Sequence, residues 1–162
     1  PDFDASREKA AALRLEVAFP GYADYHAAPA LYRAADVFVS PTYAEGFSNT
    51  ILEAMASGQA VLSCRSVGVV DCIRDRENGL LVEAGDIAAQ TAALSRLVTD
   101  AALRRRLADA ALQECRRVYS WHAVGRQIIG IYEDLRGTTP VTGIDPHIPL
   151  APCRFRAEPH LL

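Results

Sequence analysis

The feature that most constrains the fold is a pair of short, continuously apolar segments separated by a helix-length segment. Val37–Ser40 is ended by Pro41, and residues 60–64 read AVLSC. Apolar runs of this length, without alternating polar residues, are typical of strands buried on both faces. Residues 49–57 between them are rich in helix formers and are followed by Gly58. A strand, a helix and a strand in this order predict parallel strands with the helix packed on the sheet.

Two further segments extend this pattern. Leu15–Phe19 precedes the breaker pair Pro20-Gly21, and Leu80–Val82 follows an Asn-Gly turn, so we predict a strand for each. Together the segments predict an α/β fold, a Rossmann-like parallel sheet flanked by helices, with a helical C-terminal part. Four strands are few for a doubly wound sheet, and the first residue is Pro1. We therefore expect the domain to be incomplete at its N-terminus.

The second half of the chain predicts helices. Asp86, Asp100 and Ser120 each precede a helical pattern and are of the types that cap helix N-termini. The last of these helices carries an apolar stripe that begins at Trp121, which we expect to pack against the core. Residues 137–162 differ, with five prolines and two glycines in 26 residues, and predict an extended or disordered tail. The folded domain is therefore predicted to be residues 1–136.

Composition excludes several classes of function. The net charge of −3 gives no electrostatic basis for binding nucleic acid. The apolar stretches are too short to cross a membrane and no signal peptide is visible, so we expect a cytoplasmic protein. The four cysteines form no C-x-x-C pair and have no histidine at a zinc-finger spacing. We interpret them as reduced thiols and expect no metal site.

Residues 45–53, EGFSNTILE, hold the candidate site. In a parallel sheet, ligands bind at the carboxyl ends of the strands, and the segment 37–40 carries the chain to that edge. A helix is predicted to begin near Ser48, and its unpaired N–H groups would attract an anion such as a phosphate. Gly46 has no side chain, so that a phosphate or sugar could approach its backbone closely.

The two glutamates suit neutral partners on either side of such an anion. Glu53 lies about one turn into the helix, and its two oxygens can each accept a hydrogen bond from a ribose hydroxyl. Glu45 stands on the loop and suits the hydroxyls of a second sugar. Together they indicate a nucleotide sugar. A simpler interpretation is that Thr50 and Glu53 form a capping box and that Glu45 is a solvated loop residue. Spacing alone does not decide between the two.

The wider sequence resembles a known family. The stretch ADVFVSPTYAEGFSNTILEAMASGQAVLSC is similar to the C-terminal, donor-binding domain of retaining family 4 glycosyltransferases with the GT-B fold, which carry a Glu-x7-Glu motif at this place. NGLLVEAGD, the Asp-x-x-Leu-Arg sequence at Asp100 and YSW at 119–121 also match. The resemblance covers roughly residues 10–135.

This resemblance implies a role for each residue of the motif. Glu45 would contact the donor sugar and is the candidate catalytic residue. Glu53 would hold the ribose hydroxyls. The residues between them would meet the sugar and the diphosphate through backbone amides and hydroxyls: Gly46, Phe47, Ser48, Asn49 and Thr50.

Many members carry a Gly-Gly pair and a glutamate where this chain has Val67–Asp71. Because the match is incomplete there, we leave Gly68 and Asp71 outside the candidate site.

For the whole enzyme, the resemblance implies transfer of a sugar, with retention, from a nucleoside-diphosphate sugar to an acceptor hydroxyl. No metal ion or other cofactor is expected. The acceptor, a sugar or glycolipid, would bind an N-terminal domain, and the whole enzyme could contact a membrane peripherally. The family's diphosphate-binding Arg and Lys find no match, since Lys9 is the only lysine. We therefore expect this chain alone to be inactive. The alternatives are a non-catalytic nucleotide or sugar-phosphate binding module and a GT-B nucleotide-sugar epimerase.

Overall fold

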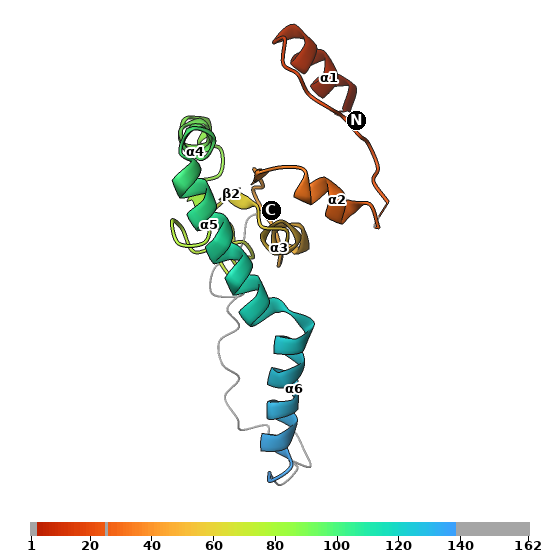
Figure 1. Ribbon diagram of the computed structural model, residues 1–162, viewed down its shortest axis with the longest axis vertical. Helices are drawn as coiled ribbons and strands as arrows, with labels where there is room; N and C mark the ends of the chain where they lie inside the picture. The colour runs from red at the N-terminus through yellow and green to blue at the C-terminus, as the bar shows by residue number, and fades with distance from the viewer. Residues whose placement is uncertain (1–2, 25, 139–162) are drawn as a thin grey trace, which may run out of the picture. The chain divides into compact units, whose positions relative to one another are not determined.

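The computed structural model describes residues 3–24 and 26–138. In chain order its elements are α1 Phe3–Ala12, α2 Ala28–Arg33, β1 Val37–Ser40, α3 Asn49–Ala56, β2 Ala60–Cys64, β3 Leu80–Val82, α4 Ile87–Thr99, α5 Ala101–Glu114, a π-helical segment η1 Cys115–Tyr119, and α6 Trp121–Leu135. Figure 1 labels the helices α1–α6 and the strand β2 among them.

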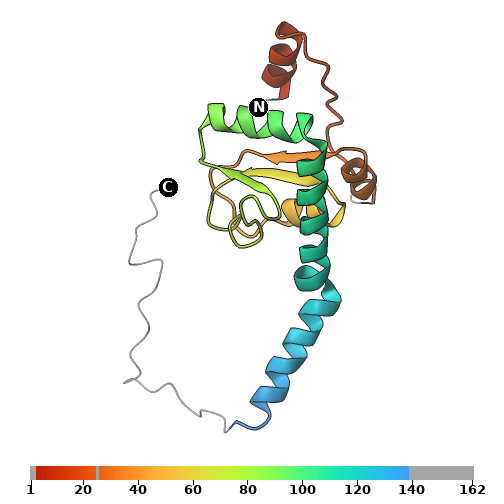
Figure 2. The ribbon, with the colours of Figure 1, turned by 60° about the vertical axis from the view of Figure 1, so that its left-hand side comes forward.

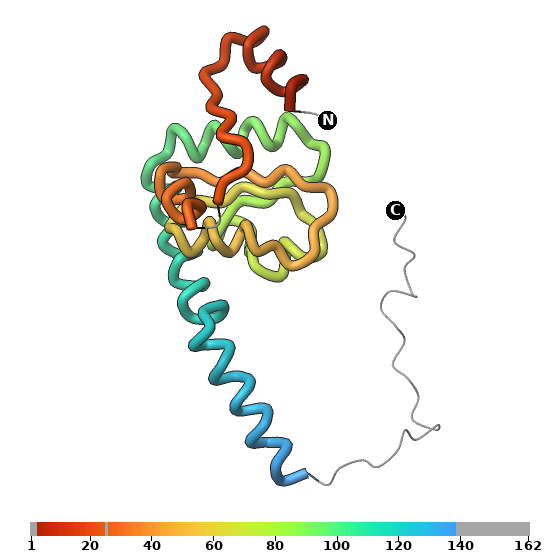
Figure 3. Tube along the Cα trace, turned by 90° about the vertical axis from the view of Figure 1, so that its right-hand side faces the viewer, coloured from red at the N-terminus to blue at the C-terminus, as the bar shows by residue number. Residues whose placement is uncertain are grey.

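The sheet of the described residues has three parallel strands in the order β1-β2-β3. The register pairs Ser40 with Ser63 and Cys64 with Val82, so the strands end nearly level. The predicted parallel sheet is confirmed, and the Cα trace in Figure 3 runs from β1 through α3 and back into β2. Because β2 is the central strand, every one of its residues is buried, as its apolar sequence predicted.

The strand predicted for Leu15–Phe19 is wrong, because these residues belong to no strand. Leu15 and Val17 are 57% and 48% exposed. Phe19 instead packs edge-on against Phe3 of α1, with ring centroids 5.6 Å apart. An apolar run becomes a strand only where a neighbouring strand pairs with it, and local sequence does not reveal that partner.

Helices cover both faces of the sheet, and Figure 2 shows α3 and α4 on opposite sides of the strands. Val61 packs with Ile51 and Met55 of α3 on one face. On the other face, Leu62 packs with Leu97 of α4 and Leu107 of α5. Side chains alternate between the faces along β2, as the pleat of a strand requires. These two layers of helix around a parallel sheet are the predicted α/β arrangement.

Burial of β1 on both faces was also predicted, and this prediction is wrong. Val39 is 41% exposed, and its neighbours in the strand are only partly buried. Among the described residues, the strand pairs with β2 alone, so that it lies at an edge of the sheet. An edge strand has one neighbour fewer, so the same apolar sequence buries less surface than it does in β2.

The predicted helix starts are confirmed. Oδ1 of Asp86 accepts a hydrogen bond from the Ala89 N–H at 2.9 Å, and Asp100 caps α5 in the same way. Oγ of Ser120 accepts from the Ala123 N–H at 3.2 Å at the start of α6. Trp121, however, is 92% exposed, so its predicted packing against the core is wrong. Ala123 follows Trp121 by two residues, which is about 200° around the helix, so it lies on the opposite side and is buried in place of Trp121.

The chain divides into two compact units, residues 1–124 and 125–162. The described part of the second unit, residues 125–138, is the larger part of α6 and a following turn, with Ile128, Ile131 and Leu135 exposed. The extended tail predicted from residue 137 onward lies outside the described residues, apart from positions 137 and 138. Within residues 3–24 and 26–138, we find no helix with the length and apolar character needed to span a bilayer.

Candidate functional site

Loops from all three strands meet at one edge of the sheet. Because the strands are parallel, Ser40, Cys64 and Val82 end at the same edge. Oγ of Ser63 donates to the Ser40 carbonyl at 2.8 Å, and the Arg65 N–H donates to the Val82 carbonyl at 2.8 Å. Residues 41–48 leave β1 at this edge, so the predicted site lies where parallel sheets bind ligands.

The N-terminus of α3 opens at this edge. Ser48 is the N-cap of this helix, as predicted, and has an extended backbone conformation. It is also buried, with 1% of its surface exposed. Its side chain makes no capping bond with the helix backbone, and its Oγ instead lies 3.1 Å from Oγ1 of Thr50. The first turn of α3 therefore has N–H groups that this side chain does not satisfy. Such groups, together with the helix dipole, are suited to an anion.

The same geometry argues against the capping-box interpretation of Glu53. A capping box would require Thr50 at the N-cap, but Ser48 occupies that position and Thr50 lies inside the first turn. The Glu53 carboxylate accepts a hydrogen bond from the Tyr32 hydroxyl of α2, with Oη–Oε2 2.8 Å. Its hydrogen-bond partner is thus on another helix, 21 residues away in sequence.

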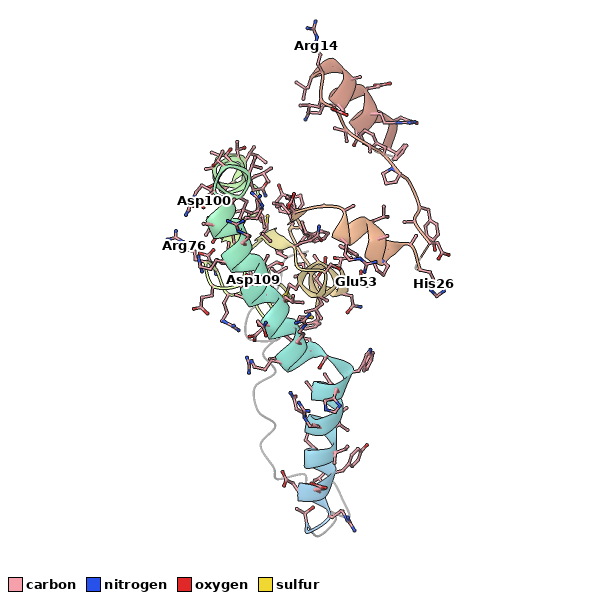
Figure 4. The ribbon with its side chains drawn as sticks, viewed as in Figure 1. Arg14, His26, Glu53, Arg76, Asp100 and Asp109 are labelled. Atoms are coloured by element: carbon pink, nitrogen blue, oxygen red, sulfur yellow. The ribbon has the colours of Figure 1, made fainter. Side chains whose placement is uncertain are left out.

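Glu53 lines a pocket between α2 and α3, which we call the Glu53 pocket. Its volume is about 340 Å³. Figure 4 labels Glu53 on α3 and His26 just before α2. The pocket is lined by His26, Ala28, Pro29, Tyr32, Glu53, Ala56 and Ser57. A charged acceptor among apolar and aromatic side chains is the composition expected of a small-molecule site.

Tyr32 keeps its proton in this pocket. Burial, followed by its hydrogen bond to the Glu53 carboxylate, raises the pKa of Tyr32 to about 12. At neutral pH, the Tyr32 hydroxyl is therefore protonated and can donate to Oε2 of Glu53. A carboxylate has about four lone-pair positions, so Glu53, which is exposed, can still accept hydrogen bonds from two ligand hydroxyls.

The loop that precedes α3 holds the other predicted residues. Glu45 is half-buried, and its carbonyl accepts a hydrogen bond from the Gly68 N–H at 3.2 Å. Phe47 is 49% exposed, and its ring centroid lies 5.7 Å from that of Tyr119. Asn49 and Thr50 are exposed in the first turn of α3. Glu45 does not line the Glu53 pocket.

Gly46 faces open space. A methyl group built on it would meet no atom of the chain within 4 Å, and its φ lies outside the left-handed region. Neither packing nor backbone conformation therefore requires glycine at this position. The absence of a side chain leaves room beside the N-terminus of α3 for a ligand to approach the backbone.

Sequence reasoning missed Tyr32 and His26. Both lie in the Glu53 pocket because α2 packs against α3. No local signal in the sequence identifies this contact, since it depends on how two helices pack.

Comparison with known proteins identifies the family. The family model described as glycosyl transferases group 1 matches residues 2–100. A D-inositol 3-phosphate glycosyltransferase from Salinispora arenicola is 38% identical over 104 residues, which are 64% of this chain and 23% of that protein. The chain thus spans about a quarter of the length of this curated relative.

Solved structures show the same fold. Sucrose-phosphate synthase from Thermosynechococcus elongatus matches with a TM-score of 0.72 at 28% identity, over 84% of this chain and 35% of that chain. Anabaena HepE in complex with UDP-glucose matches with a TM-score of 0.70 over 82% of this chain and 36% of that chain, and at 22% identity it is a likeness of fold alone. These matches confirm the predicted α/β fold and the resemblance to GT-B glycosyltransferases. Since the family model covers more than half of its residues, the chain belongs to the group 1 glycosyl transferases.

Proposed function

We propose that this chain binds the nucleoside-diphosphate sugar donor of a glycosyltransferase. The observation that carries the proposal is the Glu53 carboxylate, which accepts from Tyr32 at 2.8 Å in a pocket one helical turn from the N-terminus of α3. In this proposal Glu53 accepts hydrogen bonds from the two ribose hydroxyls. Tyr32 already orients the carboxylate, so ligand binding costs less side-chain entropy at Glu53 than it would at a glutamate without such a contact.

The diphosphate would lie at the N-terminus of α3. The N–H groups of its first turn are not capped by Ser48, and the open space at Gly46 admits phosphate oxygens to the backbone. A glutamate one turn further along would repel a phosphate placed beside it. The anion therefore belongs at the helix end and the neutral ribose at Glu53.

The donor sugar would lie beyond the diphosphate, beside Glu45 and Phe47. Glu45 is the candidate catalytic residue, and its carboxylate would accept hydrogen bonds from sugar hydroxyls. That HepE, a protein of the same fold, was solved in complex with UDP-glucose supports this class of ligand. Retention of configuration and independence from metal ions stay predictions from the family resemblance.

Transfer to an acceptor is proposed for the whole protein. A departing diphosphate carries much charge, and cations directed at it usually contribute much of the catalysis. The single lysine of this chain, Lys9, lies in α1. We therefore expect this chain alone to bind the donor without transferring the sugar. A sugar or glycolipid acceptor, and peripheral membrane contact, belong to the same proposal. A non-catalytic binding module is the second candidate, and the absence of transfer by the whole protein would favour it.

Calorimetric titration with nucleotides tests the proposal directly. The chain is titrated with UDP, GDP and ADP and with the 2′,3′-dideoxy form of each. We expect one of the three diphosphates to bind, and removal of its two ribose hydroxyls to weaken binding by at least about 100-fold, because each hydrogen bond to a carboxylate contributes about 1.5–3 kcal/mol. Equal affinity for the ribose and dideoxyribose forms would contradict the role of Glu53, and no binding of any diphosphate would contradict the function.

Gly46→Ala is expected to weaken diphosphate binding about tenfold without changing the melting temperature. The new methyl group meets no atom of the chain within 4 Å, so the fold is unaffected, but it occupies space that the ligand needs. Calorimetry and thermal unfolding on the same sample separate the two effects. Gly130→Ala in α6, which also adds a methyl group in open space, is the matched control and should leave the affinity unchanged. Unchanged affinity in Gly46→Ala would mean that no ligand approaches this peptide.

A further inference from the structure

Gly68, which the sequence left outside the candidate site, packs directly on the loop that holds Glu45. It is buried, and its N–H donates to the Glu45 carbonyl at 3.2 Å. A methyl group built on Gly68 would overlap the carbonyl group of Gly46 and lie 2.8 Å from the Glu45 carbonyl oxygen. Only a glycine at position 68 therefore permits the backbone carbonyls of Glu45 and Gly46 to lie where they do.

The segment that carries Gly68 is tied to the core. Val69, the next residue, is fully buried in the cluster that includes α3. Its N–H donates to the Ser66 carbonyl at 3.1 Å, and its carbonyl accepts from the Ile73 N–H at 2.9 Å. Because this turn is buried and hydrogen-bonded, it defines a fixed surface, and the Glu45 loop rests against it.

A second contact supports the same loop from another element. The Tyr119 hydroxyl donates to the Asp71 carbonyl at 2.9 Å, which joins η1 to the turn after Gly68. The Tyr119 ring also lies against Phe47, with centroids 5.7 Å apart. The two residues on either side of Gly46 are thus held by contacts with the turn after β2 and with η1.

We propose that Gly68 is a positioning residue for the donor sugar. By accommodating the backbone carbonyls of Glu45 and Gly46 in direct contact, it sets where the Glu45 side chain and the Gly46 backbone meet the sugar and the adjacent phosphate. It does not itself touch the ligand. This inference rests on the proposed function. Gly68 would fix the geometry of the site where the donor sugar binds, whereas the ribose would bind at Glu53, whose position does not depend on Gly68.

The test compares two ligands in one variant. UDP-glucose, GDP-mannose and ADP-glucose are titrated into the wild-type chain and into Gly68→Ala, each beside its own diphosphate. A methyl group at Gly68 must displace the backbone carbonyl of Gly46 and, with it, the loop that holds Glu45. We therefore expect the sugar nucleotide to lose roughly tenfold more affinity than its diphosphate loses, which corresponds to one lost hydrogen bond to a charged group.

Gly79→Ala is the matched control for loss of stability. A methyl group at Gly79 would lie 2.9 Å from the Ile73 side chain and 3.1 Å from the Val61 carbonyl, neither of which belongs to the Glu45 loop. This variant should melt at a lower temperature and keep the wild-type ratio of sugar-nucleotide to diphosphate affinity. If Gly68→Ala also keeps that ratio, Gly68 has a structural role only and the inference is overturned.

A measurement on the unaltered chain covers the case in which Gly68→Ala does not fold. The exchange of the Gly68 amide hydrogen, which is bonded to the Glu45 carbonyl, is followed by NMR with saturating diphosphate and with saturating sugar nucleotide. We expect the sugar nucleotide to slow this exchange several-fold beyond the diphosphate. Equal exchange with both ligands overturns the inference alone. Absence of binding by all three diphosphates removes the proposed function and this inference with it.

Discussion

Replacing Glu53 by alanine is expected to weaken nucleoside-diphosphate binding by roughly 100-fold, because two charge-assisted hydrogen bonds to the ribose are lost. The effect on stability should be small. Glu53 is exposed, and its contact with Tyr32 is a hydrogen bond between two side chains at the surface. Calorimetric titration measures the affinity, and thermal unfolding of the same sample shows whether the fold is intact.

The dideoxy nucleotide turns this variant into a thermodynamic cycle. Wild type should bind the ribose form more tightly than the dideoxyribose form. Glu53→Ala should bind both equally, because it lacks the carboxylate that accepts hydrogen bonds from the ribose hydroxyls. Glu133→Ala, which removes an exposed glutamate of α6, is the control and should behave like wild type. Tyr32→Phe keeps the ring but releases Oε2 of Glu53, and it should fall between wild type and Glu53→Ala. A lower melting temperature with unchanged affinity would instead assign Glu53 a structural role.

Glu114→Gln is expected to destabilise the chain by about 2 kcal/mol and to lower its melting temperature by about 4–8 °C. The Glu114 side chain at the end of α5 is only 10% exposed. It accepts two hydrogen bonds from Arg74, at 3.0 and 3.1 Å, and two from Arg117, at 3.1 and 3.0 Å. The bonds to Arg74 join α5 to the turn before β3. Because Arg74 is half-exposed, we expect less than the full cost of breaking a buried pair.

The pH dependence of this loss has a definite sign. Hydrogen bonds from Arg74, and secondarily from Arg117, lower the pKa of Glu114 from 4.5 to about 2. The unfolded chain therefore takes up the proton first as pH falls. The stabilisation is present in full above pH 4.5 and is lost as pH falls from there toward 2. Urea unfolding of wild type and variant at pH 7, 5, 4 and 3 should give a stability difference that shrinks below pH 4.5.

Glu77→Gln is the matched control for Glu114→Gln. Glu77 bonds the same Arg74, through Nε at 2.8 Å, but its side chain is 68% exposed. An exposed pair of this kind contributes only about 0.2–1 kcal/mol, so its loss should barely change the melting temperature. A stability difference for Glu114→Gln that is constant with pH would contradict the proposed ionic contribution.

Local sequence was sufficient to identify most elements of the fold. The continuous apolar run of β2 and the asparagine-glycine turn before β3 predicted strands that the structure contains. Asp86, Asp100 and Ser120 each cap the helix that follows. A capping residue lies within four residues of the N–H group that it bonds, so a short stretch of sequence is enough to predict the start of the helix. The position of Ser48 at the start of α3 was predictable for the same reason.

The failed predictions share a different cause. Leu15–Phe19 has the composition of a strand but no strand beside it, and β1 has the sequence of a buried strand but an edge position. Trp121 is of a type that usually packs in a core, yet the phase of α6 turns Ala123 inward. In each case the neighbours decide the outcome, and those neighbours are distant in sequence.

For the candidate site as well, the sequence predicted the arrangement within consecutive elements but not the contacts between distant ones. The order of Glu45, Gly46 and Glu53 around the start of a helix was readable from their spacing, because strand, loop and helix are consecutive. The partners of these residues were not. Tyr32 reaches Glu53 because α2 packs on α3, and Gly68 reaches Glu45 because β1 and β2 are parallel and end level, which brings their following loops together. Spacing along the chain determines which groups share an element, whereas strand register and helix packing determine which groups touch.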